Sequence, residues 1–374
     1  MSSRPETVVW LVRHGLSTFN LQGRCQGCCD LPELTEAGRQ AARVTGGRLR
    51  RAGICALVSS PLRRAAQTAF EIRDELAGEI QLTFDARLRE IELPEWEGLP
   101  HVDIPLRFPE QFQNWRLHPC HFSMTSPQSA RIFPVRSLYQ RVGEFWRYLV
   151  GAYSGRSIAL VTHGGTGRAL ATTALGLGPR YFQNIQQSNC AVSRLRLPPA
   201  TQEARLELLN DTSHLDARLP KLKESKTGTR LLLIPAVGED AVDLCRIATS
   251  LEPVPVDKVF AVGAVGMRTA SLTFPRYVTG SMRQVSEGSL QQCVHEAVDH
   301  RNPHLLMHLA IVASMACLRR LLREQFDLTG AATERVVLAD TGITAVHHPG
   351  GGDRPVLQTL NMFEPEFGFA GGYV

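Results

Sequence analysis

Residues 7–15 read Thr7-Val8-Val9-Trp10-Leu11-Val12-Arg13-His14-Gly15, and this stretch decides the fold. The apolar, β-branched run from Thr7 to Val12 is typical of a strand buried in a parallel sheet. Arg13 and His14 follow at its carboxyl end, where open α/β sheets place their ligands. Gly15 would let the backbone turn tightly behind the imidazole. We therefore predict an α/β domain with a site at this sheet edge.

Two further apolar runs end in similar side chains. Residues 55–58 form a short strand pattern that leads to Pro61, which suits the first turn of a helix. Arg63 would then lie near a helix N-terminus, which favours anions. Residues 157–162 form a third strand pattern and are followed by His163 and Gly164. A compact pocket for a phosphate dianion would result from the convergence of Arg13, His14, Arg63 and His163.

The composition excludes several other classes of protein. Of 374 residues, 43% are hydrophobic and 21% are charged, so the chain has enough apolar side chains for a core. The 41 Lys and Arg exceed the 36 Asp and Glu by only five, which does not indicate a nucleic-acid partner. The longest apolar stretch, Leu305–Leu318, is shorter than the roughly 20 residues that span a bilayer. Residues 1–6 show no secretory leader, and we expect a cytoplasmic protein without a membrane partner.

The nine cysteines do not indicate a disulfide framework or a metal site. An odd number spread over a long chain fits reduced thiols. Cys25, Cys28 and Cys29 are clustered, but a metal site would need further ligands at suitable spacing, and the sequence offers none. We expect no metal and no other cofactor.

Four motifs make the first half of the chain resemble the histidine phosphatase superfamily, which has the phosphoglycerate mutase-like fold. These are residues 11–15 with Ser17 and Asn20, residues 59–69, residues 88–90 and residues 161–164. The similarity extends from about residue 7 to residue 215 and includes Gln26 and Gly27. The resemblance implies a three-layer sandwich, in which helices flank a mostly parallel central sheet.

The resemblance also implies a role for each residue of the motifs. His14 would be the nucleophile that takes up the phosphoryl group, and Glu90, favoured over Glu92, would protonate the leaving alcohol. A neutral imidazole attacks phosphorus well, and fixed cationic donors can then stabilise the transferred group without a metal. The non-bridging oxygens would be held by Arg13, Arg63 and His163, with further contacts to the substrate from Ser17, Asn20, Gln26 and Gly27.

The segment after Glu90 favours a phosphatase over a mutase. Residues 93–98 resemble the phosphatase branch, and residues 99–141, with a short helix at 108–115, should cover the pocket and select the substrate. Gln26-Gly27 and residues 186–190 resemble metal-independent phosphoserine phosphatases with a tandem second domain, which makes phosphoserine the leading substrate. The relatives often carry Gly-Glu-Ser before the next helix, whereas residues 133–138 read Phe-Pro-Val-Arg-Ser-Leu, which replaces an acidic contact by Arg136 or by nothing, so this analogy is incomplete.

Three alternatives to a phosphoserine phosphatase stay open. The first is a bisphosphoglycerate-dependent phosphoglycerate mutase. The second is a phosphatase that acts on a phosphosugar or on a nucleoside phosphate of the cobamide pathway. The third is a non-catalytic scaffold that binds a phosphorylated ligand. In each case the partner is a small phosphorylated metabolite, and a homodimer is possible.

The second half is interpreted as a shortened, degenerate copy of the first, in preference to an unrelated α/β domain. We predict a catalytic domain at 1–215, a linker at 216–229 and a non-catalytic α/β domain at 230–374. Residues 11–14 align with 233–236, residues 67–69 with 268–270, and residues 161–164 with 312–315. In this alignment Ala236 and Ser314 replace His14 and His163.

Overall fold

The computed structural model describes residues 5–76, 78–199, 204–215, 219–222, 226–236, 241–252, 254–277, 281–299, 302, 304–350 and 354–363. The chain divides into two compact units, Met1–Leu206 and Glu207–Val374. The predicted linker at 216–229 lies partly outside the described residues, since 216–218 and 223–225 are not among them.

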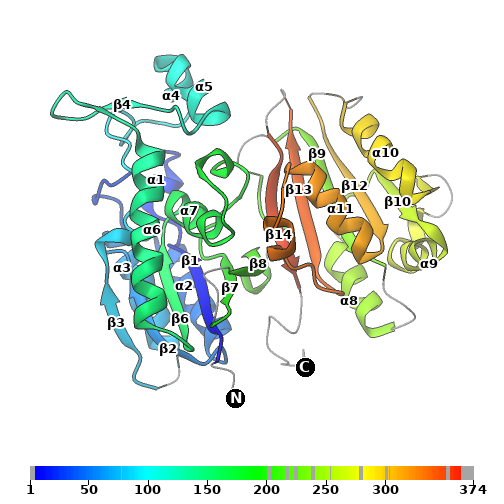
Figure 1. The fold of residues 1–374 in the computed structure, drawn as a ribbon, viewed down its shortest axis with the longest axis horizontal. Coiled ribbons are helices and arrows are strands. Elements are labelled where there is room, and N and C mark those ends of the chain that lie inside the picture. Colours follow the sequence, from blue (N-terminus) through cyan, green and yellow to red (C-terminus); the bar gives the residue numbers. More distant parts are fainter. Residues whose placement is uncertain are drawn as a thin grey trace. The chain divides into compact units, whose positions relative to one another are not determined.

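The first unit is built on a sheet with the strand order β7-β1-β6-β2-β3 (Figure 1). Parallel pairing joins β1 (Thr7–Arg13), β6 (Ser157–Thr162), β2 (Ile54–Ser59) and β3 (Gln81–Phe84). The last strand of this sheet, β7 (Val192–Leu197), runs antiparallel to β1. The three predicted strands are confirmed as β1, β2 and β6. Because they are parallel, their carboxyl ends lie at one edge of the sheet.

Helices flank this sheet as predicted (Figure 1). One pair that packs together is α2 (Glu36–Leu49) and α3 (Arg63–Glu75), and another is α6 (Pro134–Ala152) and α7 (Gly164–Ala174). The Thr35 hydroxyl caps α2 by accepting a hydrogen bond from the backbone N–H of Gly38 at 3.0 Å. Pro134 occupies the first turn of α6, where its missing N–H costs nothing.

The start of α2 lies directly against the turn that follows His14. A Cβ atom placed on Gly15 would lie 2.6 Å from the carbonyl oxygen of Gly38, and one on Gly38 would overlap the carbonyl oxygen of Leu16. Both positions therefore require glycine because two backbone segments approach each other, and this contact fixes where the His14 turn lies.

Gly38→Ala is expected to lower the free energy of unfolding by about 1–3 kcal/mol, because the new methyl group overpacks a backbone contact. Gly47→Ala is the matched control in the same helix, where nothing lies within 4 Å of an added Cβ. It should raise stability by about 0.5–1 kcal/mol through helix propensity alone. Urea unfolding of both variants measures the two effects, and equal changes would show that the backbone contact is not rigid.

The second unit contains a sheet with the strand order β11-β10-β12-β9-β13-β14-β8. Its parallel strands are β9 (Gly228–Pro235), β12 (Leu306–Ala313), β10 (Lys258–Val262) and β11 (Met282–Val285). Antiparallel pairing adds β13 (Ile343–Pro349), β14 (Val356–Met362) and β8 (Arg205–Asp211). The helices between the parallel strands are α8 (Ala241–Leu251), α9 (Gly263–Thr273) and α10 (Glu287–Asp299), and α11 (Met315–Gln325) follows the last of these strands.

The second sheet repeats the strand order and directions of the first. In both sheets an antiparallel strand (β7 or β13) borders the first parallel strand (β1 or β9), and the next three strands follow in the same order. The His14 N–H donates to Thr162 O at 2.8 Å, and the Ala236 N–H donates to Ala313 O at 2.8 Å. Ala236 therefore holds the backbone position of His14, and Ser314 follows β12 as His163 follows β6.

The pairing of β8 with β14 is reciprocal. Leu209 lies opposite Leu360, and each strand continues into an asparagine with positive φ, 53° at Asn210 and 55° at Asn361. Asn210 Nδ2 donates to Gln358 O at 2.6 Å, while Asn361 Nδ2 donates to Glu207 O at 2.7 Å. β8 and β14 thus hold each other through the same contact made in both directions.

Candidate active site

His14 directly follows β1, and its side chain is buried, with 2% of it exposed. Its Nδ1 atom lies 2.8 Å from the carbonyl oxygen of Gly15. Because a carbonyl oxygen can only accept, Nδ1 carries a proton in this contact, and the neutral form of the ring then has its lone pair on Nε2. A lone pair on a fixed, neutral imidazole is what a histidine nucleophile needs.

His163 lies beside His14 at the N-terminus of α7. The two rings have their centroids 5.1 Å apart, and the His163 side chain is fully buried. Its Nε2 atom lies 2.7 Å from the Ser60 hydroxyl, while its buried Nδ1 atom has no hydrogen-bond partner among the described residues. Burial, together with Arg64, His14 and Arg13, holds the pKa of His163 well below its usual value. His163 is therefore neutral at pH 7 and can offer a ring N–H to an anion.

Arg13 is the last residue of β1 and directly precedes His14. Its Nη1 atom donates to the carbonyl oxygen of Gln187 at 2.8 Å, whereas its buried Nε atom has no partner among the described residues. Burial lowers the pKa of Arg13 to about 10, and Glu90 opposes this shift. The guanidinium therefore keeps its charge at neutral pH, with at least one N–H available for a ligand.

The second arginine of the cluster is Arg64, and the prediction of Arg63 is not met. The Arg63 side chain is exposed, and its backbone N–H is bound by Asp30. Arg64 is fully buried and donates to the carbonyl oxygens of Cys29 and Gly27, both at 2.8 Å. Its Nε atom is buried without a partner among the described residues, and burial lowers its pKa. Consecutive residues on a helix point about 100° apart, so only one of the two arginines can face inward.

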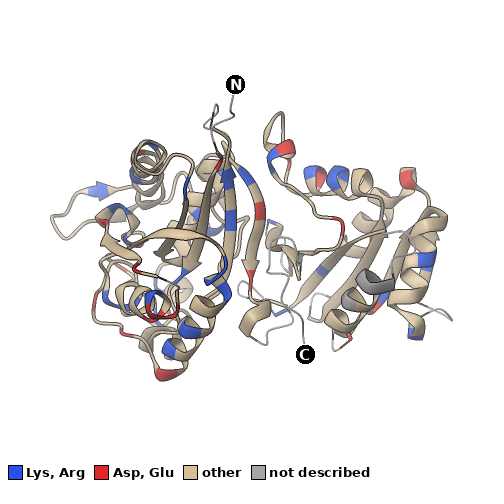
Figure 2. Cartoon of the chain, turned by 90° about the horizontal axis from the view of Figure 1, so that it is seen from below, with Lys and Arg blue, Asp and Glu red and all other residues tan. Residues whose placement is uncertain are grey.

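Many surface arginines differ from Arg13 and Arg64 in being paired with acids. Arg39 and Arg43 both bind Glu71, and Arg50 binds Glu75. Basic and acidic residues lie interspersed along the elements of each unit (Figure 2). No ion pair to Arg13 or Arg64 occurs among the described residues. A buried guanidinium group beside a half-buried one, both without a paired carboxylate, is costly in an empty site, and the pair suits a bound dianion.

Glu90 lies against the N-terminus of α7. Its carboxylate accepts the backbone N–H groups of Gly165 and Thr166, each at 3.0 Å. A Cβ atom at Gly165 would lie 2.6 Å from Glu90 Oε1, so glycine is needed there. Arg141 Nη2 and Cys28 Sγ both bind the Glu90 carbonyl oxygen at 3.0 Å. Glu92 is exposed, and the structure therefore supports Glu90 over Glu92 as the carboxyl group of the site.

The predicted substrate-binding residues Ser17, Asn20, Gln26 and Gly27 lie in the loop after His14. The Ser17 hydroxyl donates to Gln26 Oε1 at 2.9 Å, and Asn20 Oδ1 accepts from Asn189 Nδ2 at 3.1 Å. Asn189 Nδ2 also lies 2.8 Å from the His14 carbonyl oxygen. Ser17 and Asn20 form a capping box at α1 (Thr18–Leu21), and Gly27 accepts from Arg64. These residues shape the loop around His14.

The segment expected to cover the pocket contains two short helices, α4 (Ile104–Arg107) and α5 (Pro109–Leu117), and the pair β4 (Met124–Thr125) and β5 (Arg131–Ile132). The helix predicted at 108–115 is confirmed as α5. Figure 1 shows α4, α5 and β4 beyond the end of the sheet at which β1 ends.

Aromatic packing fixes this segment to the domain. Trp115 of α5 lies with its ring centroid 5.1 Å from that of Phe122 and 5.3 Å from that of Phe182. Gln183 connects α5 to α7, since it binds the Trp115 carbonyl oxygen at 2.8 Å and Arg168 Nη1 at 2.6 Å.

Neither a metal cluster nor a membrane span is found in the described part of the chain. No group of three or more His, Cys, Asp or Glu residues there could hold a metal ion. Burial raises the pKa of Cys25 to about 12 and that of Cys28 to about 11, so both thiols stay protonated at pH 7. Among the described residues, no helix is both long enough and apolar enough to cross a bilayer.

Three residues of the site were not among those predicted from the sequence: Arg64, Asn189 and Thr68, whose hydroxyl accepts the Gly15 N–H. A signal for Arg64 was present, because the buried face of α3 includes Ala65, Thr68 and Ile72, and Arg64 continues this face whereas Arg63 does not. Asn189 carried no such signal, since it reaches His14 from a loop that has no periodic pattern.

Comparison with known proteins gives one family. The sequence model of the "Histidine phosphatase superfamily (branch 1)" matches residues 9–212. A relative from Arabidopsis thaliana, "Probable 2-carboxy-D-arabinitol-1-phosphatase", is 36% identical over 191 residues, which are 51% of this chain and 38% of that protein. The chain thus spans well under half the length of this plant relative.

Two bacterial relatives are matched over nearly their whole length. The "Probable phosphoglycerate mutase GpmB" of Citrobacter koseri is 34% identical over 221 residues, 58% of this chain and 97% of that protein. The "Phosphoserine phosphatase 1" of Hydrogenobacter thermophilus is 29% identical over 207 residues, 55% of this chain and 92% of that protein.

Proposed function

Because the chain belongs to branch 1 of the histidine phosphatase superfamily, we propose that its first unit hydrolyses a small phosphomonoester through a phosphohistidine on His14. The observation that carries the proposal is the contact between His14 Nδ1 and the Gly15 carbonyl oxygen. With Nδ1 held by the Gly15 carbonyl oxygen, the Nε2 lone pair belongs to a buried ring beside His163.

The first step transfers the phosphoryl group to the enzyme. His14 Nε2 forms a bond to phosphorus while the bond to the ester oxygen breaks. Arg13, Arg64 and His163 hold the non-bridging oxygens, so positioning and charge stabilisation supply most of the catalysis. Glu90 gives its proton to the departing alcohol, which leaves a carboxylate held by the α7 amides.

The second step releases phosphate. A water molecule gives a proton to the Glu90 carboxylate as its oxygen attacks phosphorus, and the bond to His14 Nε2 breaks. Glu90 is then protonated and His14 neutral again, so the cycle closes without a redox change. Arg13 and Arg64 balance the charge of the transferred group, and the proposal therefore needs no metal.

Phosphoserine is the leading substrate within this proposal. It is supported by the name of the Hydrogenobacter relative and by the Gln26-Gly27 motif. The name of the Arabidopsis relative refers to a phosphorylated carboxy sugar alcohol, so both names describe phosphate esters that also carry a carboxylate. A phosphosugar, a nucleoside phosphate of the cobamide pathway and the mutase reaction are the competing assignments.

We further propose that the second unit is a degenerate copy of the first. The repeated strand order and the matched backbone positions of His14 and Ala236 support a common origin. Ala236 and Ser314 cannot replace a histidine nucleophile and its histidine partner, so the proposed phosphohistidine chemistry is assigned to the first unit. The predicted domain limits, the cytoplasmic location and the homodimer stay predictions.

One experiment decides between the proposal and its competitors. The full chain is incubated with phosphoserine, 3-phosphoglycerate, a phosphosugar and a nucleoside phosphate, and released phosphate is measured with and without EDTA. Labelled substrate should leave acid-labile, alkali-stable label on the protein, as a phosphohistidine does, and EDTA should change nothing. Isomerisation that needs bisphosphoglycerate and releases little phosphate would indicate the mutase. Ligand binding without protein-bound label would indicate a scaffold.

A further inference from the structure

A single buried hydroxyl connects the two turns that carry His14 and Arg64. Thr68 lies one helical turn after Arg64 on α3 and is fully buried. Its Oγ1 atom donates to the Arg64 carbonyl oxygen at 2.7 Å and accepts the Gly15 backbone N–H at 3.0 Å. A hydroxyl has only one proton, so the donation to Arg64 leaves its lone pairs for Gly15.

The peptide bond between His14 and Gly15 is held at both ends. Thr68 binds its N–H, while Asn189 Nδ2 lies 2.8 Å from its carbonyl oxygen, which belongs to His14. The next carbonyl oxygen along the chain, that of Gly15, receives the His14 Nδ1 proton and also lies 3.1 Å from Asn189 Nδ2. The orientation of the His14 ring is therefore set by a backbone segment that Thr68 helps to fix.

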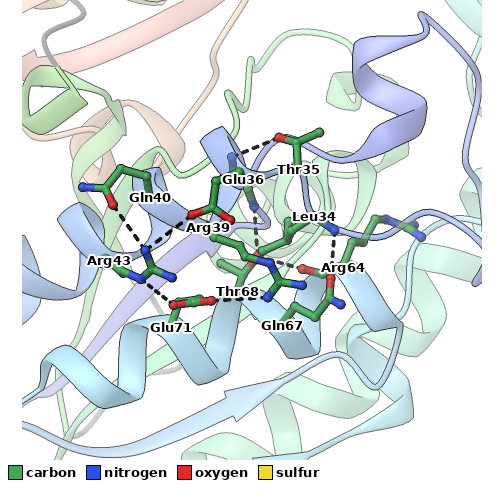
Figure 3. A network of polar contacts seen from close by, with 12 residues as sticks. Leu34, Thr35, Glu36, Arg39, Gln40, Arg43, Arg64, Gln67, Thr68 and Glu71 are labelled. Carbon is green, nitrogen blue, oxygen red and sulfur yellow. Dashed lines mark hydrogen bonds and ion pairs between the residues drawn. The ribbon is translucent and has the colours of Figure 1, made fainter.

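Thr68 lies on a helix, α3, that several polar contacts hold in place. Figure 3 shows it between Arg64 and Glu71 on α3, with polar contacts that connect α3 to α2 and to the chain before it. Gln67 Oε1 accepts the Leu34 N–H at 2.8 Å, and Glu71 binds Arg43 at 2.8 Å and Arg39 at 3.3 Å. A displacement of α3 would have to break these contacts, so the position of the hydroxyl is well defined.

We propose that Thr68 is a positioning residue. Its one hydroxyl binds both Gly15 N–H and Arg64 O, and it thereby fixes the turn that carries His14 relative to the helix that carries Arg64. The inference rests on the proposed function, because it concerns the phosphorylation of His14. Thr68 itself touches no substrate. It acts by keeping Nε2 of His14 in line with phosphorus while Arg64 faces the same phosphoryl group.

Thr68→Val tests this directly, since valine keeps the shape of threonine and lacks the hydroxyl. The rate of His14 phosphorylation in a single turnover should fall about 10- to 100-fold, as small misplacements of reacting groups do, while KM changes little. Thr68→Ser restores the hydroxyl without the methyl group and should recover most of the rate. The matched control is Thr269→Val, a buried threonine of α9 that aligns with Thr68 in the second unit.

A merely structural role would give a different pattern. It would lower the melting temperature of Thr68→Val but leave its single-turnover rate at 10 °C equal to that of the wild type, and this result would overturn the proposal. So would Thr68→Ser being as slow as Thr68→Val, or Thr269→Val being equally slow. If the wild type itself forms no phosphohistidine, the proposed function fails. If the wild type forms it and Thr68→Val forms it equally fast, only the role of Thr68 fails.

Discussion

His14→Ala is expected to reduce phosphate release to the uncatalysed background. The substitution removes the imidazole that we propose takes up the phosphoryl group, and the neighbouring histidine is not placed to replace it. His163 Nε2 is bound to the Ser60 hydroxyl, and the ring is fixed at the N-terminus of α7. Released phosphate and protein-bound label, measured on the same preparation, should disappear together.

His295→Ala is the control for the loss of a histidine, because His295 is exposed on α10 in the second unit. It should turn over at the wild-type rate and carry the same amount of label. Measurable turnover by His14→Ala, with a folded protein by circular dichroism, would contradict the phosphohistidine mechanism.

Arg64→Met should lower kcat/KM by roughly 10²–10³-fold, whereas Arg63→Met should leave it unchanged within assay error. The two residues are adjacent and of the same type, so each variant is the control for the other. Arg64 contributes a buried charge without an acidic partner among the described residues, while Arg63 contributes an exposed side chain. Inhibition by phosphate and by vanadate, which mimics the transferred group, should weaken in parallel for Arg64→Met only.

Arg64 also binds the carbonyl oxygens of Gly27 and Cys29, so its loss affects the loop as well as the charge. Arg64→Lys separates these effects, since lysine keeps the charge but cannot bind both carbonyl oxygens and a phosphate oxygen together. We expect an intermediate rate for this variant. A larger loss of kcat/KM in Arg63→Met than in Arg64→Met would show that Arg63, the residue named by the sequence prediction, binds the phosphoryl group.

The elements of the first unit that could be predicted are those with a strong local signal. The buried runs of β1, β2 and β6 are apolar throughout, and Arg13, His14 and His163 follow two of them directly. Because parallel strands bring their carboxyl ends to one edge, placing the strands was enough to place these side chains. The prediction of Glu90 rested on a sequence motif. In the structure, the hydrogen bonds from the α7 amides to its carboxylate distinguish Glu90 from Glu92.

The other site residues could not be predicted, because their positions depend on where a helix begins and on contacts between residues far apart in the sequence. Which of Arg63 and Arg64 faces inward depends on where α3 begins, and a shift of one residue exchanges their roles. Asn189 lies some 175 positions after His14 and is brought to it by the chain between α7 and β7. Thr68 looks like an ordinary buried helix residue until its two hydrogen-bond partners are known.

The pairing of β8 with β14 has a consequence for any attempt to isolate the family segment. That segment ends at residue 212, just after β8, yet most of β8 belongs to the second compact unit and is held there by β14. A chain cut after residue 215 would keep β8 and lose the strand that covers it. It would then present an unprotected edge strand, the kind of surface through which truncated β proteins aggregate. The end of the family segment and the end of the first compact unit thus fall on different sides of most of β8, so a truncation at either point changes what β8 is paired with.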